Sequence, residues 1–384
     1  MHEHKKFKGI VRGYSSKGLG VVTHPDGRVF FVQGCVRGDE GIFEEKSFTG
    51  KFGFADFKEL TQKSPWRIES HCPHQGFLPK MCGGCPWMMM DYQEQLWAKM
   101  NRVESAFRKA GLKTNISPIQ AAPQTFNYRN RASLKTNGKE IGYVSTASNI
   151  LAPIKTCIIL TEKNQETLKQ IMKSLPRDDF KTGEGEWNFL EIDEDTDYSQ
   201  VKLNTHLPFK QGNTQQNIFM QNWVKEKLEG IASGKKILEL FCGSGNFTQI
   251  LADLNFSEIC AVEGDKKAVE KLKHKNLKDT QVFVADLFKK DIADTLASFI
   301  TSPQILLLDP PRDGMKEIAS VVEKFSSLEK IISISCDPET CARDLKKLVE
   351  SGWQIEEVLP LDQFPHTPHV EILATLKKIK HNRE

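Results

Sequence analysis

The sequence predicts an α/β protein with a doubly wound parallel sheet in its C-terminal part and β-rich regions before it. In the C-terminal part, five apolar runs (KKILELF, EICAVEG, TQVFVAD, QILLLDPP and KIISISC) are each followed by a helical segment. That alternation is typical of buried parallel strands joined by crossover helices. Residues 7–60 instead contain short strand-like runs separated by glycine or Pro-Asp-Gly turns. The 384 residues, 39% of them apolar, are enough for two or three domains with their own cores.

We expect the first domain to span residues 1–62 and to be a small antiparallel β-barrel. A purely structural extension would give the same pattern. The second domain, residues 63–215, begins with a stretch that has almost no periodicity, followed by a helix with Asp91 as its N-cap. That helix ends at Gly111, and alternating segments from Phe126 onward predict a second β-rich region. The third domain, residues 216–384, starts with a helix over residues 216–232 and contains the parallel sheet.

Composition and charge limit the classes of function. The net charge of +3 is only mildly basic, so a nucleic-acid partner cannot be inferred from bulk charge and would need a local basic patch. No stretch approaches the ~18 apolar residues of a membrane span, and the N-terminus lacks the apolar region of a signal peptide. We therefore expect a cytoplasmic protein without a membrane partner, and a monomer. Nine cysteines in a reducing compartment favour metal binding or catalysis over disulfides.

A cofactor site is predicted where the first parallel strand ends in ELFCGSGNFT. Gly243 and Gly245 allow a sharp turn and close approach of a ligand to the backbone. Glu263, at the end of the second strand, could accept hydrogen bonds from a ribose diol, and Asp286, at the end of the third, could meet an adenine amino group. Thr248 replaces the third glycine of a dinucleotide-binding turn, which favours S-adenosylmethionine over a nicotinamide cofactor.

Reactive side chains follow the ends of the next two strands. Asp309 ends strand four and Cys336 ends strand five, and ligands of such sheets gather beyond the carboxyl ends of the strands. Since Asp337-Pro338 begins a helix, its amide dipoles would favour the Cys336 thiolate, making it a candidate nucleophile. A small buried hydrophobe is the alternative. Glu371, near the start of a terminal strand after DQFPHTPHV, is a candidate general base.

Several blocks in order resemble the motifs of the RNA uridine-5-methyltransferases. They are FNYRNRASL, FKQGNTQQNIFM, ELFCGSGNFT, LLLDPPRDG, SCDPETCARDL and DQFPHTPHVE, and the resemblance runs from about Cys72 onward. It implies a Rossmann-like S-adenosylmethionine methyltransferase domain and an enzyme acting on RNA. Cys336 would be the nucleophile and Glu371 the base. The residues implied to hold or border the methyl donor are Gln211, Phe241, Asn246, Glu263, Asp286 and Asp309.

The resemblance also implies a covalent mechanism. C5 of uracil is too weak a nucleophile to attack a sulfonium methyl group, and adding the Cys336 thiolate at C6 makes C5 an enolate carbon. The target base must be flipped out of the RNA stack. We expect the substrate to be 23S ribosomal RNA, with the T-loop of transfer RNA as the alternative. Phe126, Tyr128, Arg129 and Arg131 are candidates for RNA contacts, although the aromatic residues fit a core equally well.

Four cysteines, Cys72, Cys82, Cys85 and Cys157, form a possible metal-binding set. Spacing alone allows zinc or an iron-sulfur cluster. The MCGGC segment is similar to that of family members with a 4Fe-4S cluster, which the resemblance therefore implies here, although the gap from Cys72 to Cys82 is longer than is usual in the family. The N-terminal barrel resembles a TRAM domain, in which Lys5, Lys6, Lys8, Arg12 and Lys17 could bind phosphates.

Other functions fit the sequence less well. RNA cytosine-5-methyltransferases also use a cysteine adduct, but resemble a pattern with a cysteine following proline after strand four, where this chain has Asp309-Pro310-Pro311-Arg312. Amino-group methylases follow Pro-Pro with an aromatic residue, and Arg312 departs from that. A non-catalytic RNA-binding protein would require a broken motif, and none of the motifs is broken.

Overall fold

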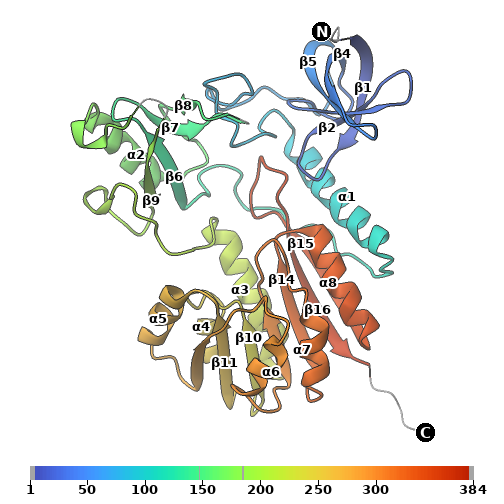
Figure 1. The fold of residues 1–384 in the computed structure, drawn as a ribbon, viewed down its shortest axis with the longest axis vertical. Helices are drawn as coiled ribbons and strands as arrows, with labels where there is room; N and C mark the ends of the chain where they lie inside the picture. The colour runs from blue at the N-terminus through green and yellow to red at the C-terminus, as the bar shows by residue number, and fades with distance from the viewer. Residues whose placement is uncertain (1–4, 147, 184–185, 380–384) are drawn as a thin grey trace. The chain divides into compact units, whose positions relative to one another are not determined.

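The computed structural model describes residues 5–146, 148–183 and 186–379, and the chain forms two compact units (Figure 1). Each unit is built from three separate stretches of the chain. The first unit comprises Met1–Lys99, Pro123–Leu207 and Phe364–Pro368, and the second comprises Met100–Ala122, Pro208–Gln363 and His369–Glu384. The division into three domains stays a prediction. No helix in the described part of the chain is both long and apolar enough to cross a membrane.

The first unit begins with a closed five-stranded barrel, which confirms the predicted barrel, although the strands Val29–Val32 and Gly53–Gln62 pair in parallel and not antiparallel as predicted. Alternation of buried and exposed residues along the strands directs Phe7, Val11, Phe30 and Phe43 into one core. The strand order is β1-β2-β3-β5-β4. The strands are β1 Lys6–Tyr14, β2 Gly20–Thr23, β3 Val29–Val32, β4 Glu40–Phe48 and β5 Gly53–Gln62.

The rest of the first unit contains a four-stranded sheet in the order β8-β7-β6-β9 and the helix α2. The sequence predicted a β-rich region here but not α2 (Glu162–Ser174), whose segment is mostly polar and buries few apolar residues, among them Leu168 and Ile171. The strands are β6 Arg131–Thr136, β7 Ile141–Val144, β8 Leu151–Pro153 and β9 Asn188–Asp193, with 3-10 turns at Asp178–Phe180 and Tyr198–Gln200.

The second unit contains a seven-stranded sheet in the order β12-β11-β10-β13-β14-β16-β15. The first five strands in this order are parallel to one another, β16 is antiparallel to both of its neighbours, and β15 therefore runs in the same direction as the first five. This confirms the predicted α/β fold. The strands are β10 Lys236–Leu240, β11 Glu258–Glu263, β12 Thr280–Val284, β13 Ile305–Leu308, β14 Lys330–Ser335, β15 Trp353–Leu361 and β16 Glu371–Lys378.

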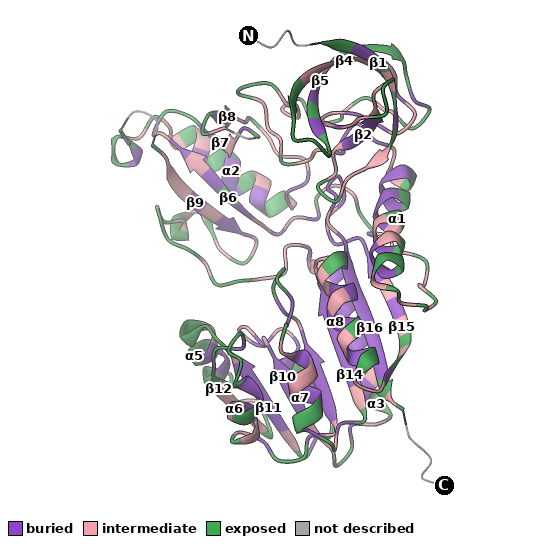
Figure 2. Ribbon diagram, turned by 45° about the vertical axis from the view of Figure 1, so that its right-hand side comes forward, coloured by how far each residue is buried: buried purple, intermediate pink, exposed green. Residues whose placement is uncertain are grey.

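Helices cover both faces of this sheet because alternate side chains of each strand point to opposite sides. Leu238 and Leu240 pack in one core with the C-terminal half of α1 and with α6, α7 and α8. Ile237 packs on the other side with α3 and α4. Figure 2 shows central strands such as β10, β14 and β16 as largely buried and parts of the helix surfaces as exposed. The helices are α1 Tyr92–Ala110, α3 Thr214–Glu229, α4 Thr248–Ala252, α5 Lys266–His274, α6 Ile292–Ala297, α7 Ile318–Lys324 and α8 Pro338–Glu350.

Candidate active site

Three of the predicted site residues lie together at the end of the seven-stranded sheet where its parallel strands terminate; this end is called the sheet edge below. Asp309 directly follows β13 and Cys336 directly follows β14, so both stand at the carboxyl ends of parallel strands. Glu371 is the first residue of β16, which pairs antiparallel with β14 so that Ile372 is opposite Ser335. The antiparallel direction brings the start of β16 to the edge where β14 ends. The sheet topology therefore gathers residues that are distant in the chain.

These three side chains influence one another electrostatically. The pKa of Glu371 is raised to about 8, mainly by burial and also by the nearby Asp309 carboxyl, while Arg312 acts in the opposite direction. Burial also raises the pKa of Asp309 to about 7. The pKa of Cys336 is raised to about 12, first by burial and then by Glu371 and Asp309. A thiol, a carboxyl able to act as a base near neutral pH, and a second carboxyl thus share one site.

The thiol differs from the sequence-based expectation of a thiolate stabilised by a helix dipole. Helix α8 does begin immediately after the site, with Asp337 as N-cap accepting a hydrogen bond from the Thr340 amide at 3.0 Å. Burial and the surrounding carboxylates nevertheless raise the pKa of Cys336. Desolvation and like charge therefore outweigh the helix terminus in the state without ligands.

The glycine-rich turn after β10 has the backbone conformation that the sequence predicts. Gly245 has a φ of 92°, and a Cβ there would meet Leu272 Cδ1 at 2.4 Å, so the position requires glycine. The carboxylate of Glu263, at the end of β11, accepts the Gly243 amide at 3.0 Å through Oε2. Its Oε1 accepts the amides of Gly264 and Asp265. These bonds hold Glu263 beside the turn, where a ribose could reach its remaining lone pairs.

Two aromatic rings border the same turn. Phe241 has a φ of 62°, and its ring lies 5.7 Å from the ring of Phe288, measured between centroids. Phe288 is 51% exposed, which is unusual for a phenylalanine. The exposed Asp286 follows β12 and accepts the Phe288 amide at 3.1 Å. Phe288 was not predicted as a site residue, although an aromatic residue two positions after the predicted adenine contact was a visible signal.

The other two predicted donor-site residues are held by amide networks. Asn246 exchanges hydrogen bonds with the Asn217 side chain, each at 2.9 Å, and Asn217 lies on α3. Gln211 accepts a hydrogen bond from Gln363 Nε2 at 3.2 Å. Helix α3 begins after Asn213, which caps it by accepting the Gln216 amide, so it starts and ends slightly earlier than predicted. Through the bond to Gln211, the FKQGN segment (residues 209–213) contacts Gln363, which is close in the chain to Glu371.

One acidic residue of the site was not singled out from the sequence. Glu239 in β10 is fully buried. Burial raises its pKa to about 8; hydrogen bonding from the Thr248 side chain and backbone lowers the pKa, and the charges of Asp309 and Glu263 raise it. A buried carboxyl next to a ligand turn can stabilise a cationic ligand once it ionises.

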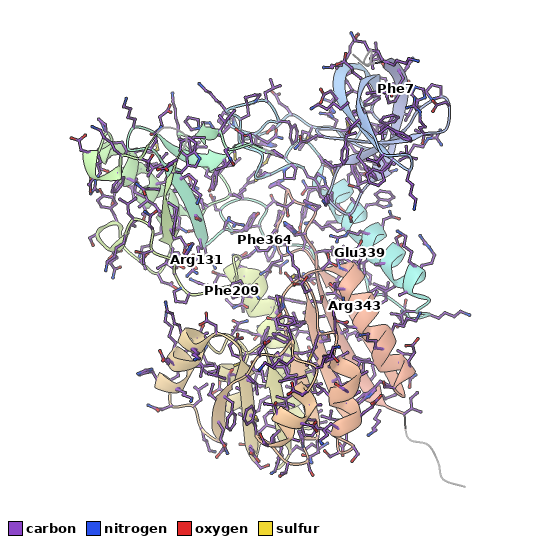
Figure 3. All side chains as sticks on the ribbon, in the orientation of Figure 1. Phe7, Arg131, Phe209, Glu339, Arg343 and Phe364 are labelled. Carbon is purple, nitrogen blue, oxygen red and sulfur yellow. The ribbon has the colours of Figure 1, made fainter. Side chains whose placement is uncertain are left out.

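One face of helix α8 forms hydrogen bonds with the loop that follows β13. Thr340 Oγ1 donates to the Arg312 carbonyl at 3.0 Å and Arg343 Nη2 donates to the Asp313 carbonyl at 2.8 Å. Further along the same face, Asp344 Oδ2 accepts the Met315 amide at 2.8 Å and Lys347 Nζ donates to the Lys316 carbonyl at 2.6 Å. Figure 3 labels Glu339 and Arg343 on this helix. The helix that begins beside Cys336 therefore fixes the loop that carries Asp309 and Arg312.

The four predicted metal-ligating cysteines line a common pocket in the first unit. Cys72, Cys82, Cys85 and Cys157 surround it together with apolar residues such as Met88 and Ile159. Burial raises the pKa of Cys82 to about 11, with a backbone hydrogen bond from Gly84 lowering it and the charges of other thiols raising it, and burial also raises the pKa of Cys85 and Cys157. Tyr143 donates its hydroxyl to Cys157 Sγ at 3.7 Å. Among the described residues, no three His, Cys, Asp or Glu side chains converge closely enough to hold one metal ion.

The remaining cysteines and the candidate RNA contacts lie elsewhere. Tyr128 is buried and donates its hydroxyl to the Pro365 carbonyl at 3.0 Å, which supports the core role. Arg131 is paired with Asp193, whereas the Arg129 guanidinium lies 5.6 Å above the Phe364 ring (labelled in Figure 3). Cys35, Cys242, Cys260 and Cys341 are buried, as expected for structural thiols.

Comparison with known proteins identifies the family. The family model for tRNA (uracil-5-)-methyltransferases matches residues 189–289 and 288–379. An uncharacterized RNA methyltransferase of Nitrosomonas europaea is 40% identical, and the alignment covers 97% of each chain. A 23S rRNA (uracil(1939)-C(5))-methyltransferase of Pseudomonas entomophila is 26% identical, with 96% of this chain and 93% of the relative covered.

A solved structure shares the fold over nearly the whole chain. It is the tRNA (uracil-54, C5)-methyltransferase of Pyrococcus abyssi in complex with S-adenosyl-L-homocysteine, with a TM-score of 0.71 and 22% identity. The alignment covers 96% of this chain and 100% of that one. The identity to the Nitrosomonas protein and the match of the family model point to the same family, and the site described above fits it. The chain belongs to the family of S-adenosylmethionine-dependent RNA (uracil-5-)-methyltransferases.

Proposed function

We propose that this enzyme methylates C5 of a specific uridine in 23S ribosomal RNA through a covalent adduct with Cys336. The observation that carries the proposal is the meeting of Cys336, Asp309 and Glu371 at one sheet edge, where their charges act on one another. The substrate follows from relatives in several Pseudomonas species that are named for 23S ribosomal RNA and align with most of this chain. A uridine in transfer RNA is the second candidate, supported by the fold shared with the Pyrococcus enzyme.

In the proposed reaction, Cys336 loses its proton to water, its thiolate adds to C6 of the uracil, and the electrons of the C5–C6 double bond pass into an enolate. C5 then takes the methyl group as the bond from methyl to the donor sulfur breaks, releasing S-adenosylhomocysteine. Glu371 removes the remaining C5 proton, and the electrons restore the C5–C6 double bond and expel the thiolate. Burial gives Glu371 a pKa of about 8, which suits a base that must gain and lose a proton near neutral pH.

The high pKa of Cys336 means that the thiol needs activation when the substrates bind. The sulfonium of the methyl donor is a fixed positive charge, and its arrival beside the carboxyls would lower the pKa of Cys336. Arg312 already acts in that direction. We assign the donor to the turn at Gly243, with Glu263 on the ribose and with Phe241, Asp286 and Phe288 around the adenine. Gln211, Asn246 and Asp309 would border the donor, and Glu239 would ionise as it binds.

We further propose that Cys72, Cys82, Cys85 and Cys157 hold a 4Fe-4S cluster with a structural role. The four thiols line one pocket, and four cysteine thiolates are the usual ligands of such a cluster. Cys157 also receives hydrogen bonds from Tyr143 and from backbone amides, and such bonds stabilise cluster thiolates. The cluster would join the loop around Cys82 to the segment before α2.

The covalent step can be tested by trapping the adduct. In Glu371→Gln the methyl group is transferred but the C5 proton stays, so a protein–RNA adduct should accumulate and survive on denaturing gels. The control is the double variant Cys336→Ala/Glu371→Gln, which should form none. Methylation by Cys336→Ala at the normal rate would show that the nucleophile is another residue. Mapping 5-methyluridine in 23S ribosomal and transfer RNA from a deletion strain identifies the substrate.

The cluster is tested by metal analysis of the anaerobically purified protein. We expect about four iron and four sulfide per chain, together with a brown colour. Both should be lost in Cys82→Ser and retained in Cys35→Ala, whose thiol lies in the barrel core. Finding stoichiometric zinc and no sulfide would show that the site binds zinc and not an iron-sulfur cluster.

A further inference from the structure

Helix α1 carries an arginine that reaches the turn containing Cys336. Arg102 Nη2 donates to Asp337 Oδ2 at 2.8 Å and to Glu339 Oε2 at 2.5 Å. The Arg102 side chain is only 16% exposed and that of Asp337 26%, so solvent screens this pair less than an ordinary surface salt bridge. Both residues belong to the second unit. Nothing in the proposed reaction uses Arg102.

Asp337 links this arginine to the nucleophile in two ways. It is the residue after Cys336, and its Oδ1 caps α8 by accepting the Thr340 amide at 3.0 Å. Its other oxygen is the one that Arg102 holds. The orientation of the Cys336 turn therefore depends on a carboxylate that is fixed from both sides. Thr340 in turn contacts the Arg312 carbonyl, so the same carboxylate borders the loop after β13.

Asp337 also contributes to the charge around the thiol. The charged groups that act on Cys336 are Glu371 from β16, Asp309 and Arg312 from the segment after β13, and Asp337 itself. Of these, only Arg312 lowers the pKa of Cys336. Against the effect of burial, hydrogen bonding from Thr340 and the charge of Arg102 lower the pKa of Asp337, so Asp337 stays ionised and the adjacent guanidinium partly offsets its charge. A cation that neutralises Asp337 weakens the field that opposes thiolate formation.

We propose that Arg102 is a positioning residue for methylation: it holds Asp337, fixes the turn that carries Cys336, and offsets the negative charge adjacent to the thiol. The proposal rests on the assignment of Cys336 as the nucleophile. It differs from a merely structural role, in which an ion pair at a helix start contributes about 0–1 kcal/mol to stability and has no effect on the thiol.

The test measures the thiol itself. Cys336 in the full-length protein is alkylated with iodoacetamide over a range of pH, and its modification is quantified by mass spectrometry of the peptide that contains it. The variants are Arg102→Gln, Asp337→Asn and the double variant. Asparagine caps helices as well as aspartate does, so α8 should keep its N-cap. The matched control is Arg108→Gln, in the last turn of the same helix, where the structure gives the arginine no ion pair with a described residue.

We expect Arg102→Gln to shift the alkylation profile to higher pH, lowering the rate near pH 8 on the order of threefold or more. The kcat for methylation should fall, whereas KM for RNA should change little. Removing the Asp337 charge should cancel the shift, so the double variant should match Asp337→Asn alone. Arg108→Gln should behave like the wild type in both measurements.

Two outcomes would overturn the proposal. One is an Arg102→Gln profile that coincides with the wild type while only the melting temperature falls, since this is the behaviour of a structural ion pair. The other is a shift that persists unchanged in the double variant. If Cys336→Ala instead proves fully active, the proposed function fails, but the alkylation profiles still show whether Arg102 controls this thiol.

Discussion

At the scale of single residues, the site is defined by carboxyls that burial makes unusually basic. Glu239 and Glu371 have a pKa of about 8 and Asp309 a pKa of about 7, and burial is the largest cause in each case. Ionising any of them in the folded protein without a ligand is unfavourable. A methyl donor that carries a positive charge can offset this cost, so the site is suited to that ligand before it arrives.

These carboxyls should make the stability of the enzyme depend on pH. The folded-state pKa of Glu371 lies above the ordinary value of 4.5, so the folded protein holds this proton more tightly than the unfolded chain does. The free energy of unfolding should therefore fall as pH rises from about 4.5 to about 8. Glu371→Gln should remove part of that fall, on the order of 2 kcal/mol.

The measurement is the melting temperature of the wild type and the variant at pH 5 and at pH 8.5, without methyl donor. The two proteins should differ more at the higher pH, where the variant should be the more stable. Glu323→Gln, at an exposed position on α7, serves as the control. An equal difference between Glu371→Gln and the wild type at both pH values would contradict the assignment of a raised pKa.

Some of these site residues could be predicted from the sequence, and others could not. Asp309 and Cys336 could be placed at one edge because each follows an apolar strand run, and chain order gives the edge. Glu239 sits inside such a run, where nothing in the pattern distinguishes a buried carboxyl at a ligand site from one paired elsewhere. Arg102 was unpredictable because its partner Asp337 is more than two hundred positions away, and only the packing of α1 brings them together.

At the scale of elements, helix α8 connects the turn that contains Cys336 to the loop that follows β13. Its residues Thr340, Arg343, Asp344 and Lys347 follow the spacing of one helix face and contact successive backbone groups of residues 312–316. The loop can follow the helix so closely because Gly314 adopts a φ of 66°. The geometry of Arg312 is therefore set by a helix whose own start lies beside Cys336.

Gly314→Ala should disturb both loops at once. A Cβ at this position would lie 2.2 Å from Asp344 Oδ2 and 2.6 Å from Arg343 Nη2, and alanine disfavours the positive φ. We expect destabilisation of about 1–3 kcal/mol and a loss of kcat larger than the change in KM. The control is Gly352→Ala, which also has positive φ but no neighbour within 4 Å of its Cβ. Equal kinetics in the two variants would mean that only backbone strain matters.

Elements were predicted well where one face is strongly apolar and poorly where tertiary contacts decide. The strands β10 to β14 match the five apolar runs, since parallel strands buried on both faces are continuously apolar. Helix α2 was missed because most of its residues are polar, and even Asn164 is buried on it. Its stability comes from packing on the small sheet through Leu168 and Ile171, which local spacing does not reveal.

At the scale of the whole molecule, the surface of the N-terminal barrel is a candidate for contacts with RNA. Phe7 and Val11 of β1 point into the barrel core, whereas Lys6, Lys8 and Arg12 of the same strand are exposed. These three cations could contact RNA phosphates at a distance from the reaction. This deepens the TRAM-like interpretation, which stays a prediction.

Replacing these three residues together by glutamine should raise KM for RNA and leave kcat at saturating RNA almost unchanged. Each lost phosphate contact should reduce the slope of log affinity against log salt by about 0.7–0.9. Affinity is measured at several salt concentrations with full-length protein. Lys58→Gln is the control, because Lys58 already pairs with Glu44 and Asp56 on the barrel. An unaltered slope in the triple variant would leave the barrel with a stabilising role alone.

The way in which the two units share the chain has a consequence for biosynthesis. The first unit contains residues 1–99 but is completed only by Phe364–Pro368, and the second also requires the strand that begins at Glu371. A ribosome makes the chain from its N-terminus, so neither unit can close while synthesis is short of these residues. The barrel can form early, but the nascent chain cannot methylate RNA until β16 has emerged and paired with β14. Premature termination before β16 would therefore yield an inactive product.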